Sequence, residues 1–191
     1  MTKQSKIVLG VVVLVVVIIV GYLVGTYNGL VKGREGVDAA WAQVEAQYQR
    51  RFDLVPNLVE SVKGVMKQEQ KVFGDLAEAR TRYAGAQTSE DKVGAANQME
   101  GALARLLVVM ENYPQLKSAE ATQTLMAQLE GTENRISVER SRYNETVKNY
   151  NVSVKVFPRN ILAGWFGFST RTMFQAAEEA ATAPKVNLEV K

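Results

Sequence analysis

The side chains that could do chemistry in this chain are carboxylates, lysines, arginines and tyrosines, because its 191 residues include no cysteine and no histidine. The absent cysteines exclude disulfides, thiolate nucleophiles and cysteine-bound metal sites. The absent histidines exclude the Ser-His-Asp triad and the histidine-containing zinc and di-iron sites. No Gly-x-x-x-x-Gly-Lys loop is present to cradle a phosphate. We therefore expect no enzymatic activity, no catalytic residue, no metal ion and no cofactor.

Charged and helix-breaking residues gather in one segment, which we call the arginine corner. Its members are Arg50, Arg51, Asp53, Pro56 and Asn57. Two arginines could grip a phosphate or a lipid headgroup. We favour a structural role, in which Asp53 pairs with an arginine and caps a new helix that has Pro56 in its first turn. A continuous, kinked helix is the alternative.

A second motif, Tyr-Asn-x-x-Val, occurs at Tyr27-Asn28 and again in two copies seven residues apart, at Tyr143-Asn144 and Tyr150-Asn151. The seven-residue spacing places these last two copies on one helix face, two turns apart. We expect the tyrosines to fill the core and the asparagines to bond across to neighbouring helices, with a ligand site as the alternative. The acidic pair Glu178-Glu179 is expected to be solvated.

The N-terminal region has the composition of a membrane anchor. Residues 7–31 carry no charge, and Ile7–Gly25 would span roughly 28 Å as a helix, close to the ~30 Å hydrocarbon core of a bilayer. A cleaved signal peptide is the alternative, but the apolar run is long and no Ala-x-Ala site follows it. Lysines and arginines flank both ends, and the positive-inside rule slightly favours a cytoplasmic N-terminus.

Four glycines follow one another at four-residue intervals on one face of this segment: Gly21, Gly25, Gly29 and Gly33. Small residues at this spacing let two membrane helices approach closely. Because the chain has one span, the partner helix would belong to a second chain. The alternative is that these glycines only reflect the general abundance of glycine in membrane helices.

The pattern of apolar residues in the rest of the chain predicts long helices. Apolar residues recur at steps of three and four from Val37 to Tyr83, from Met99 to Met110, and from Leu125 to Val154, and Ser89 and Ser118 are plausible helix starts. We therefore predict an all-α protein, in which an N-terminal transmembrane helix precedes an antiparallel bundle of long helices. The predicted boundaries are a basic tail over 1–6, the transmembrane helix over 7–29, the bundle over 30–175 and a flexible tail over 176–191.

An aromatic segment interrupts this pattern near the end of the bundle. It contains Phe157, Pro158, Trp165, Phe166 and Phe168. The Phe-Pro pair must interrupt the helix. The aromatic residues could cap the bundle core, which we favour, or dip into a membrane interface or contact a partner.

These pieces together resemble the LemA family of bacterial membrane proteins. The matching segments, in chain order, are Tyr27–Val31, Val37–Ala42, Arg50–Lys63, Glu111–Leu116, Glu139–Asn144, Tyr150-Asn151, Phe157–Asn160 and Phe166–Phe168. The resemblance implies a one-span anchor and a soluble antiparallel helical bundle. One relative in the family is linked to building membrane compartments, and no enzymatic activity is established for the family.

The function that these features predict is that of a membrane-anchored, non-enzymatic scaffold that self-associates and organises or shapes the bacterial membrane. Its expected partners are the lipid bilayer and further copies of itself, without nucleic acid or a small-molecule substrate. The expected location is the bacterial inner membrane, with the bundle on the extracytoplasmic side. The alternative is an adaptor for a membrane-protein partner, such as an envelope protease.

Overall fold

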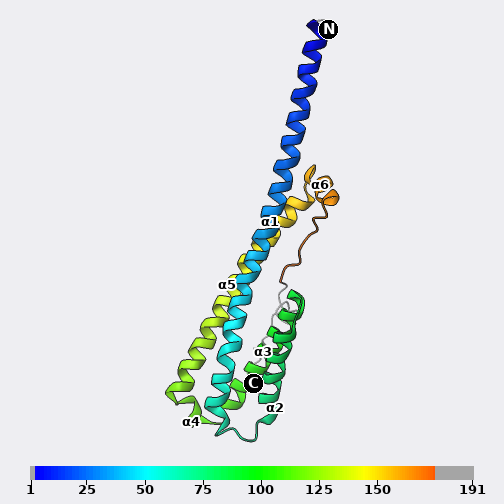
Figure 1. The fold of residues 1–191 in the computed structure, drawn as a ribbon. Coiled ribbons are helices and arrows are strands. Elements are labelled where there is room, and N and C mark those ends of the chain that lie inside the picture. Colours follow the sequence, from blue (N-terminus) through cyan, green and yellow to red (C-terminus); the bar gives the residue numbers. More distant parts are fainter. Residues whose placement is uncertain (1–2, 175–191) are drawn as a thin grey trace, which may run out of the picture. The chain divides into compact units, whose positions relative to one another are not determined.

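The computed structural model describes residues 3–174, and these form helices joined by short connections (Figure 1). The helices are α1 (Lys3–Lys63), α2 (Gln70–Gly85), α3 (Ser89–Met110), α4 (Pro114–Lys117), α5 (Glu120–Lys155) and α6 (Arg159–Trp165). The predicted all-α class is confirmed. The predictions for Glu178-Glu179 and for a flexible tail over 176–191 lie outside the described residues.

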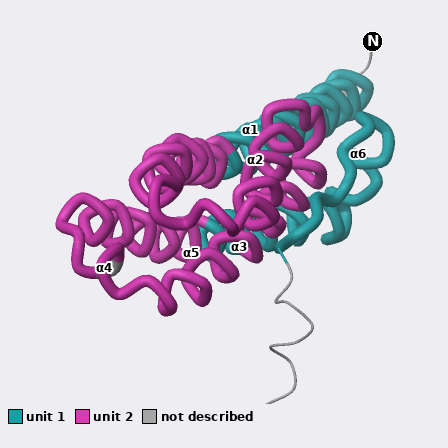
Figure 2. The backbone as a smooth tube through the Cα atoms, turned by 90° about the horizontal axis from the view of Figure 1, so that it is seen from below, with its two compact units in different colours: residues 1–41, 140–191 teal, residues 42–139 magenta. Residues whose placement is uncertain are grey.

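The chain divides into two compact units (Figure 2). Unit 1 comprises residues 1–41 and 140–191, and unit 2 comprises residues 42–139. Helices α1 and α5 each contribute one part to unit 1 and the other part to unit 2. The boundary between the units at residue 41 lies within the predicted bundle, whose bounds remain a prediction.

The N-terminal part of α1 is apolar and unpacked. The large side chains from Ile7 to Val20 are about half exposed, between 47% and 63%. Among the described helices, α1 is the one that is long and apolar enough, by length and composition, to cross a membrane. A helix whose apolar side chains face outward all round is typical of a membrane span.

Helix α1 continues through Pro56, so the prediction that Asp53 begins a new helix is wrong. Asp53 instead accepts a hydrogen bond from Gln49 Nε2 at 3.0 Å, within the same helix. A proline inside a helix costs about 3 kcal/mol. That cost is offset because the stripe on both sides of it, from Phe52 to Val62, is buried, and burying each large apolar side chain contributes about 1.5–3 kcal/mol.

The stripe from Val37 to Tyr83 is not one helix, because α1 ends at Lys63 and α2 begins at Gln70. The amides of Val65 and Met66 both donate to the carbonyl of Val62, at 3.1 and 3.0 Å, and close the turn. The next buried residue after Met66 is Val72. Val65 and Val72 are seven residues apart and fit one helix face, so periodicity alone does not show this break.

Two predicted helix starts shift slightly. The cap of α3 is Thr88 rather than Ser89, and its hydroxyl accepts a hydrogen bond from the Asp91 amide at 3.1 Å. Helix α5 begins at Glu120 rather than at Ser118, because the short α4 fills the space after Pro114. The predicted interruption at Phe157-Pro158 is confirmed, since α5 ends at Lys155.

Tyr83 of α2 is buried in unit 2, where its ring stacks on Phe52 at 4.1 Å and its hydroxyl donates to the Glu45 carbonyl at 3.5 Å. Burial, followed by the charge of Glu45, raises the pKa of Tyr83 above its usual range. The Glu45 carboxylate is itself paired with Lys92.

Because the Tyr83 pKa is raised in the folded state, we expect the chain to lose stability in alkali. An unfolded tyrosine ionises near pH ~10, so this contribution is fully present below that pH and is lost as the pH rises above it. Urea unfolding across this range should show the loss, and Tyr83→Phe should flatten it. An unchanged slope in the variant would contradict the assignment.

Candidate functional site

The core of unit 1 joins α1, α5, α6 and the segment after α6. Its buried members are Leu30, Val37, Val147, Tyr150, Val154, Ala163 and Phe168. The α5 members are three or four residues apart, so they share one helix face. This core holds the C-terminal end of the described chain against the helix that carries the apolar segment.

Asn144 and Asn151 of α5 bind an extended segment, Arg171–Phe174, through both polar atoms of each amide. Asn151 Nδ2 donates to the Arg171 carbonyl at 2.8 Å, and Asn151 Oδ1 accepts from the Arg171 amide at 2.8 Å. Asn144 makes the same pair of bonds with Phe174, at 3.0 and 2.8 Å. We call this arrangement the asparagine clamp.

The spacing of the repeated motif matches the spacing of this extended segment. Seven residues of helix rise about 10.5 Å, and three residues of extended chain advance about 10 Å. The two asparagines therefore meet residues 171 and 174 in register. The asparagines were predicted to bond across to a helix, and this is corrected, because their partner is extended backbone.

Aromatic side chains hold the same segment at Phe174. Its ring stacks on Trp41 of α1 at 5.9 Å and meets the edge of Tyr143 at 5.2 Å. The Tyr143 hydroxyl donates to the Thr172 carbonyl at 3.2 Å, and Arg171 pairs with Asp38 of α1 at 3.4 Å. The segment is thus fixed to both helices, and sequence reasoning missed Phe174 as its anchor.

The four glycines of the predicted face do not share one environment. A Cβ on Gly33 would lie 3.0 Å from the ring atom Cδ2 of Tyr150, so this glycine allows α1 and α5 to approach closely. A Cβ on Gly21, Gly25 or Gly29 would meet no other atom within 4 Å. Gly33 is therefore used within the chain, and the other three leave an open face.

Substituting Gly33 should damage the fold of unit 1, whereas substituting Gly29 should not. Gly33→Leu forces the Tyr150 ring out of a packed core and should cost about 1–3 kcal/mol. Gly29→Leu is the matched control, one turn away in open space. Thermal unfolding in mild detergent, followed by circular dichroism, measures both. Equal midpoints for the two variants would contradict the close packing.

The aromatic segment divides into a buried part and an exposed part. Phe168 is 8% exposed, lies against Tyr27 at 5.9 Å, and has the Arg34 guanidinium over its ring at 5.4 Å. Phe157 and Trp165, by contrast, are 75% and 78% exposed.

The exposed part of this segment lies beside the apolar stretch of α1. Phe157 and Pro158 line a hollow of about 480 Å³ together with Tyr22 of α1. We call Phe157, Ile161, Trp165 and Phe166 the aromatic rim; all four are exposed. The segment thus supplies core residues, as favoured from the sequence, and also an apolar surface at the end of the candidate membrane span.

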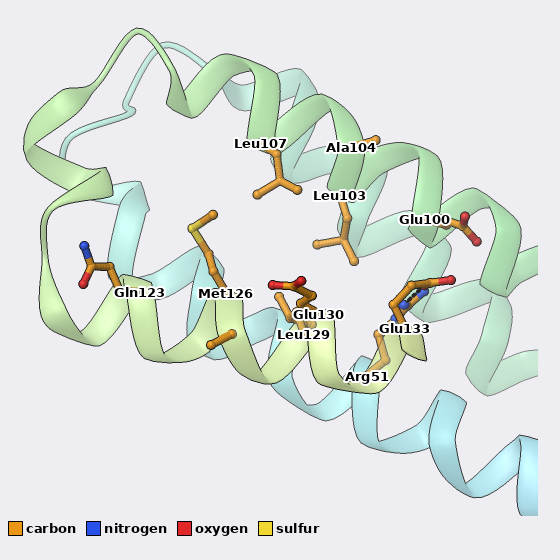
Figure 3. Close-up of a pocket in the computed structure, with 11 residues that line it drawn as sticks. Arg51, Glu100, Leu103, Ala104, Leu107, Gln123, Met126, Leu129, Glu130 and Glu133 are labelled. Atoms are coloured by element: carbon orange, nitrogen blue, oxygen red, sulfur yellow. Dashed lines mark hydrogen bonds and ion pairs between the residues drawn. The ribbon is translucent and has the colours of Figure 1, made fainter. Parts of the chain in front are cut away.

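Unit 2 has an open groove of about 640 Å³ between α3 and α5 (Figure 3). Its lining residues are Arg51, Glu100, Leu103, Ala104, Leu107, Gln123, Met126, Ala127, Leu129, Glu130 and Glu133. Leu103 and Leu107 point from α3 towards Met126 of α5. The groove thus has apolar walls and carboxylates near them.

The arginine corner does not act as a unit. Arg51 is 5% exposed and reaches the groove, where it forms an ion pair with Glu133 and donates from Nε to Thr132 Oγ1 at 3.5 Å. Arg50 and Asn57 are exposed. The two arginines are therefore not placed together to grip a phosphate, and the predicted pairing with Asp53 is replaced by pairing with Glu133.

No group of three or more acidic side chains that could hold a metal ion is present in residues 3–174. Three surface features stand out among the described residues. These are the open glycine face, the aromatic rim and the groove of unit 2.

Comparison with known proteins gives a consistent result. Magnetosome protein MamQ 2 of Paramagnetospirillum magneticum is 27% identical over 175 residues, covering 78% of this chain and 64% of the relative. Magnetosome protein MamQ of Magnetospirillum gryphiswaldense is 26% identical over 168 residues, covering 74% and 62%. The chain thus spans less than two thirds of the length of these relatives. The LemA family model matches residues 40–188, which include the asparagine clamp and the groove. The chain belongs to the LemA family.

Proposed function

We propose that this protein is a membrane-anchored, non-enzymatic scaffold that self-associates and organises or shapes the bacterial membrane. The observation that carries this proposal is the aromatic rim beside the apolar stretch of α1, within one unit. Large aromatic side chains are favoured at the membrane–water interface. A bilayer spanned by α1 would cover Trp165 and Phe157, which are otherwise left in water. The similarity to proteins named for the magnetosome supports a role of this kind.

Fluorescence quenching tests contact between the rim and lipid. Trp41 and Trp165 are the two tryptophans of the chain, so Trp41→Phe isolates Trp165 and Trp165→Phe isolates Trp41. In vesicles that contain brominated lipid, we expect Trp165 to be quenched strongly and Trp41, which stacks on Phe174, to be quenched little. Equal quenching of the two would contradict the rim contact.

Self-association would use the open glycine face in the bilayer, because small residues let two helices pack closely. Light scattering with size exclusion in mild detergent should show an oligomer that Gly25→Leu dissociates. Val20→Phe, which adds bulk to another face of α1, is the control. A wild-type chain that is monomeric and also leaves liposomes unchanged would contradict the proposal.

The proposed location is the inner membrane, with the part of the chain that follows the apolar stretch of α1 on the extracytoplasmic side. Lys3 and Lys6 precede the apolar run, and Lys32 and Arg34 follow it. Together with the α-amino group, the first pair slightly favours a cytoplasmic N-terminus. Protease added to spheroplasts should cleave the chain after the apolar stretch of α1. Full protection of that part would contradict the proposed orientation.

A further inference from the structure

The groove of unit 2 is an apolar surface that none of the described residues covers. Leu107 is 41% exposed although it lines the groove with Leu103 and Met126. The volume of the groove, about 640 Å³, lies within the ~300–1,000 Å³ that ligand sites occupy. An apolar hollow of this size is a place where a partner can bury surface.

The shape of the groove fits a helix. On the α3 wall the lining residues run from Glu100 to Leu107, and on the α5 wall from Gln123 to Glu133. These walls are about two and three helical turns long. A groove between two helices accepts the apolar face of a third helix, with anchors spaced three and four residues apart.

The charges around the groove select the kind of helix. Arg51 and Glu133 pair with each other, so their charges offset. Glu100 and Glu130 remain as the other charged lining residues. Both are exposed and form no ion pair with another described residue. The net negative charge around the groove favours a cationic occupant and disfavours anionic lipid headgroups.

We propose that this groove binds an amphipathic helix of a partner protein, with an apolar stripe flanked by lysine or arginine. The leucines and Met126 would receive the apolar stripe. Met126 can adapt to the shape of the side chain that enters, since methionine is flexible and polarisable. Glu100, on α3, and Glu130, on α5, would each meet a basic flank. The adaptor role considered from the sequence would need such a surface, and this one is independent of the membrane span.

The test uses the full chain in nanodiscs of zwitterionic lipid and two labelled peptides. Each peptide is about 15 residues long, enough to form a helix, with leucines on one face. The flanks are lysine in one peptide and glutamate in the other. Fluorescence anisotropy against empty nanodiscs measures binding. We expect the lysine peptide to bind and the glutamate peptide to bind at least about tenfold more weakly, a difference that Glu100 and Glu130 can supply by attraction and repulsion.

Variants with matched controls locate the binding. Leu107→Ser should weaken binding of the lysine peptide about tenfold, as expected for one lost apolar anchor. Val108→Ser should not, because Val108 is 66% exposed and does not line the groove. Glu130→Lys should weaken binding of the lysine peptide and strengthen binding of the glutamate peptide. Glu78→Lys on α2 should change the affinity of neither peptide.

Three outcomes would overturn the proposal. The first is equal binding of the two peptides, and the second is an equal effect of Leu107→Ser and Val108→Ser on peptide binding. The third is that the wild-type chain binds neither peptide and that Leu107→Ser lowers the mass of its oligomer. The last outcome would assign the groove to a second copy of the chain. None of them tests the contact of the aromatic rim with lipid, whose variants lie in α1 and α6.

Discussion

Replacing Asn144 and Asn151 together with alanine is expected to release Arg171–Phe174 from α5. The double variant removes four hydrogen bonds, two at each asparagine. At about 0.5–1 kcal/mol each for partly exposed bonds, the loss is about 2–4 kcal/mol. Hydrogen exchange of the Arg171 and Phe174 amides measures it directly, since these amides donate to the asparagines. We expect their protection to fall towards that of an unstructured chain.

The chemistry of the clamp provides its own controls. Asn151→Asp keeps an acceptor for the Arg171 amide but cannot donate to its carbonyl, so it should cause part of the loss. Thr146→Ala on the same helix should cause none, because the Thr146 hydroxyl donates to the Arg142 carbonyl within α5. Unchanged exchange in the double alanine variant would show that the aromatic contacts of Phe174 suffice.

Removing the carboxylate of Glu133 is expected to destabilise unit 2 by about 2–3 kcal/mol, somewhat less than the ~3–5 kcal/mol of a fully buried pair. The Arg51 side chain is 6% exposed, whereas that of Glu133 is 44% exposed. Glu133→Ala leaves the guanidinium buried without the carboxylate that it is paired with. Urea unfolding followed by circular dichroism gives the difference in the free energy of unfolding.

Replacing the other member of the pair, Arg51, should lower the free energy of unfolding less. Arg51→Met fills a similar space with an apolar side chain, and Glu133 then turns its charge to water. We expect its free energy of unfolding to lie within about 1 kcal/mol of the wild-type value. The prediction is the inequality between the two variants. If Arg51→Met costs as much as Glu133→Ala, the pair stabilises unit 2 in another way.

The local features of this protein follow from its sequence, because they depend on residues close together in the chain. Helical periodicity shows the helices, the uncharged run shows the candidate span, and Phe157-Pro158 shows where α5 stops. The lack of cysteine and histidine excludes whole classes of metal and catalytic sites without any structure. The seven-residue repeat also shows that Asn144 and Asn151 share a face.

The partners of these side chains were decided by the tertiary structure. Asn151 binds a residue 20 positions away, Asn144 one 30 positions away, and Arg51 pairs with a carboxylate 82 positions away. Pro56 lies inside a helix because distant packing on the stripe around it outweighs a local penalty. Gly33 differs from Gly29 only because Tyr150 packs against it. Periodicity specifies which face of a helix is apolar, whereas only the folded chain specifies what that face meets.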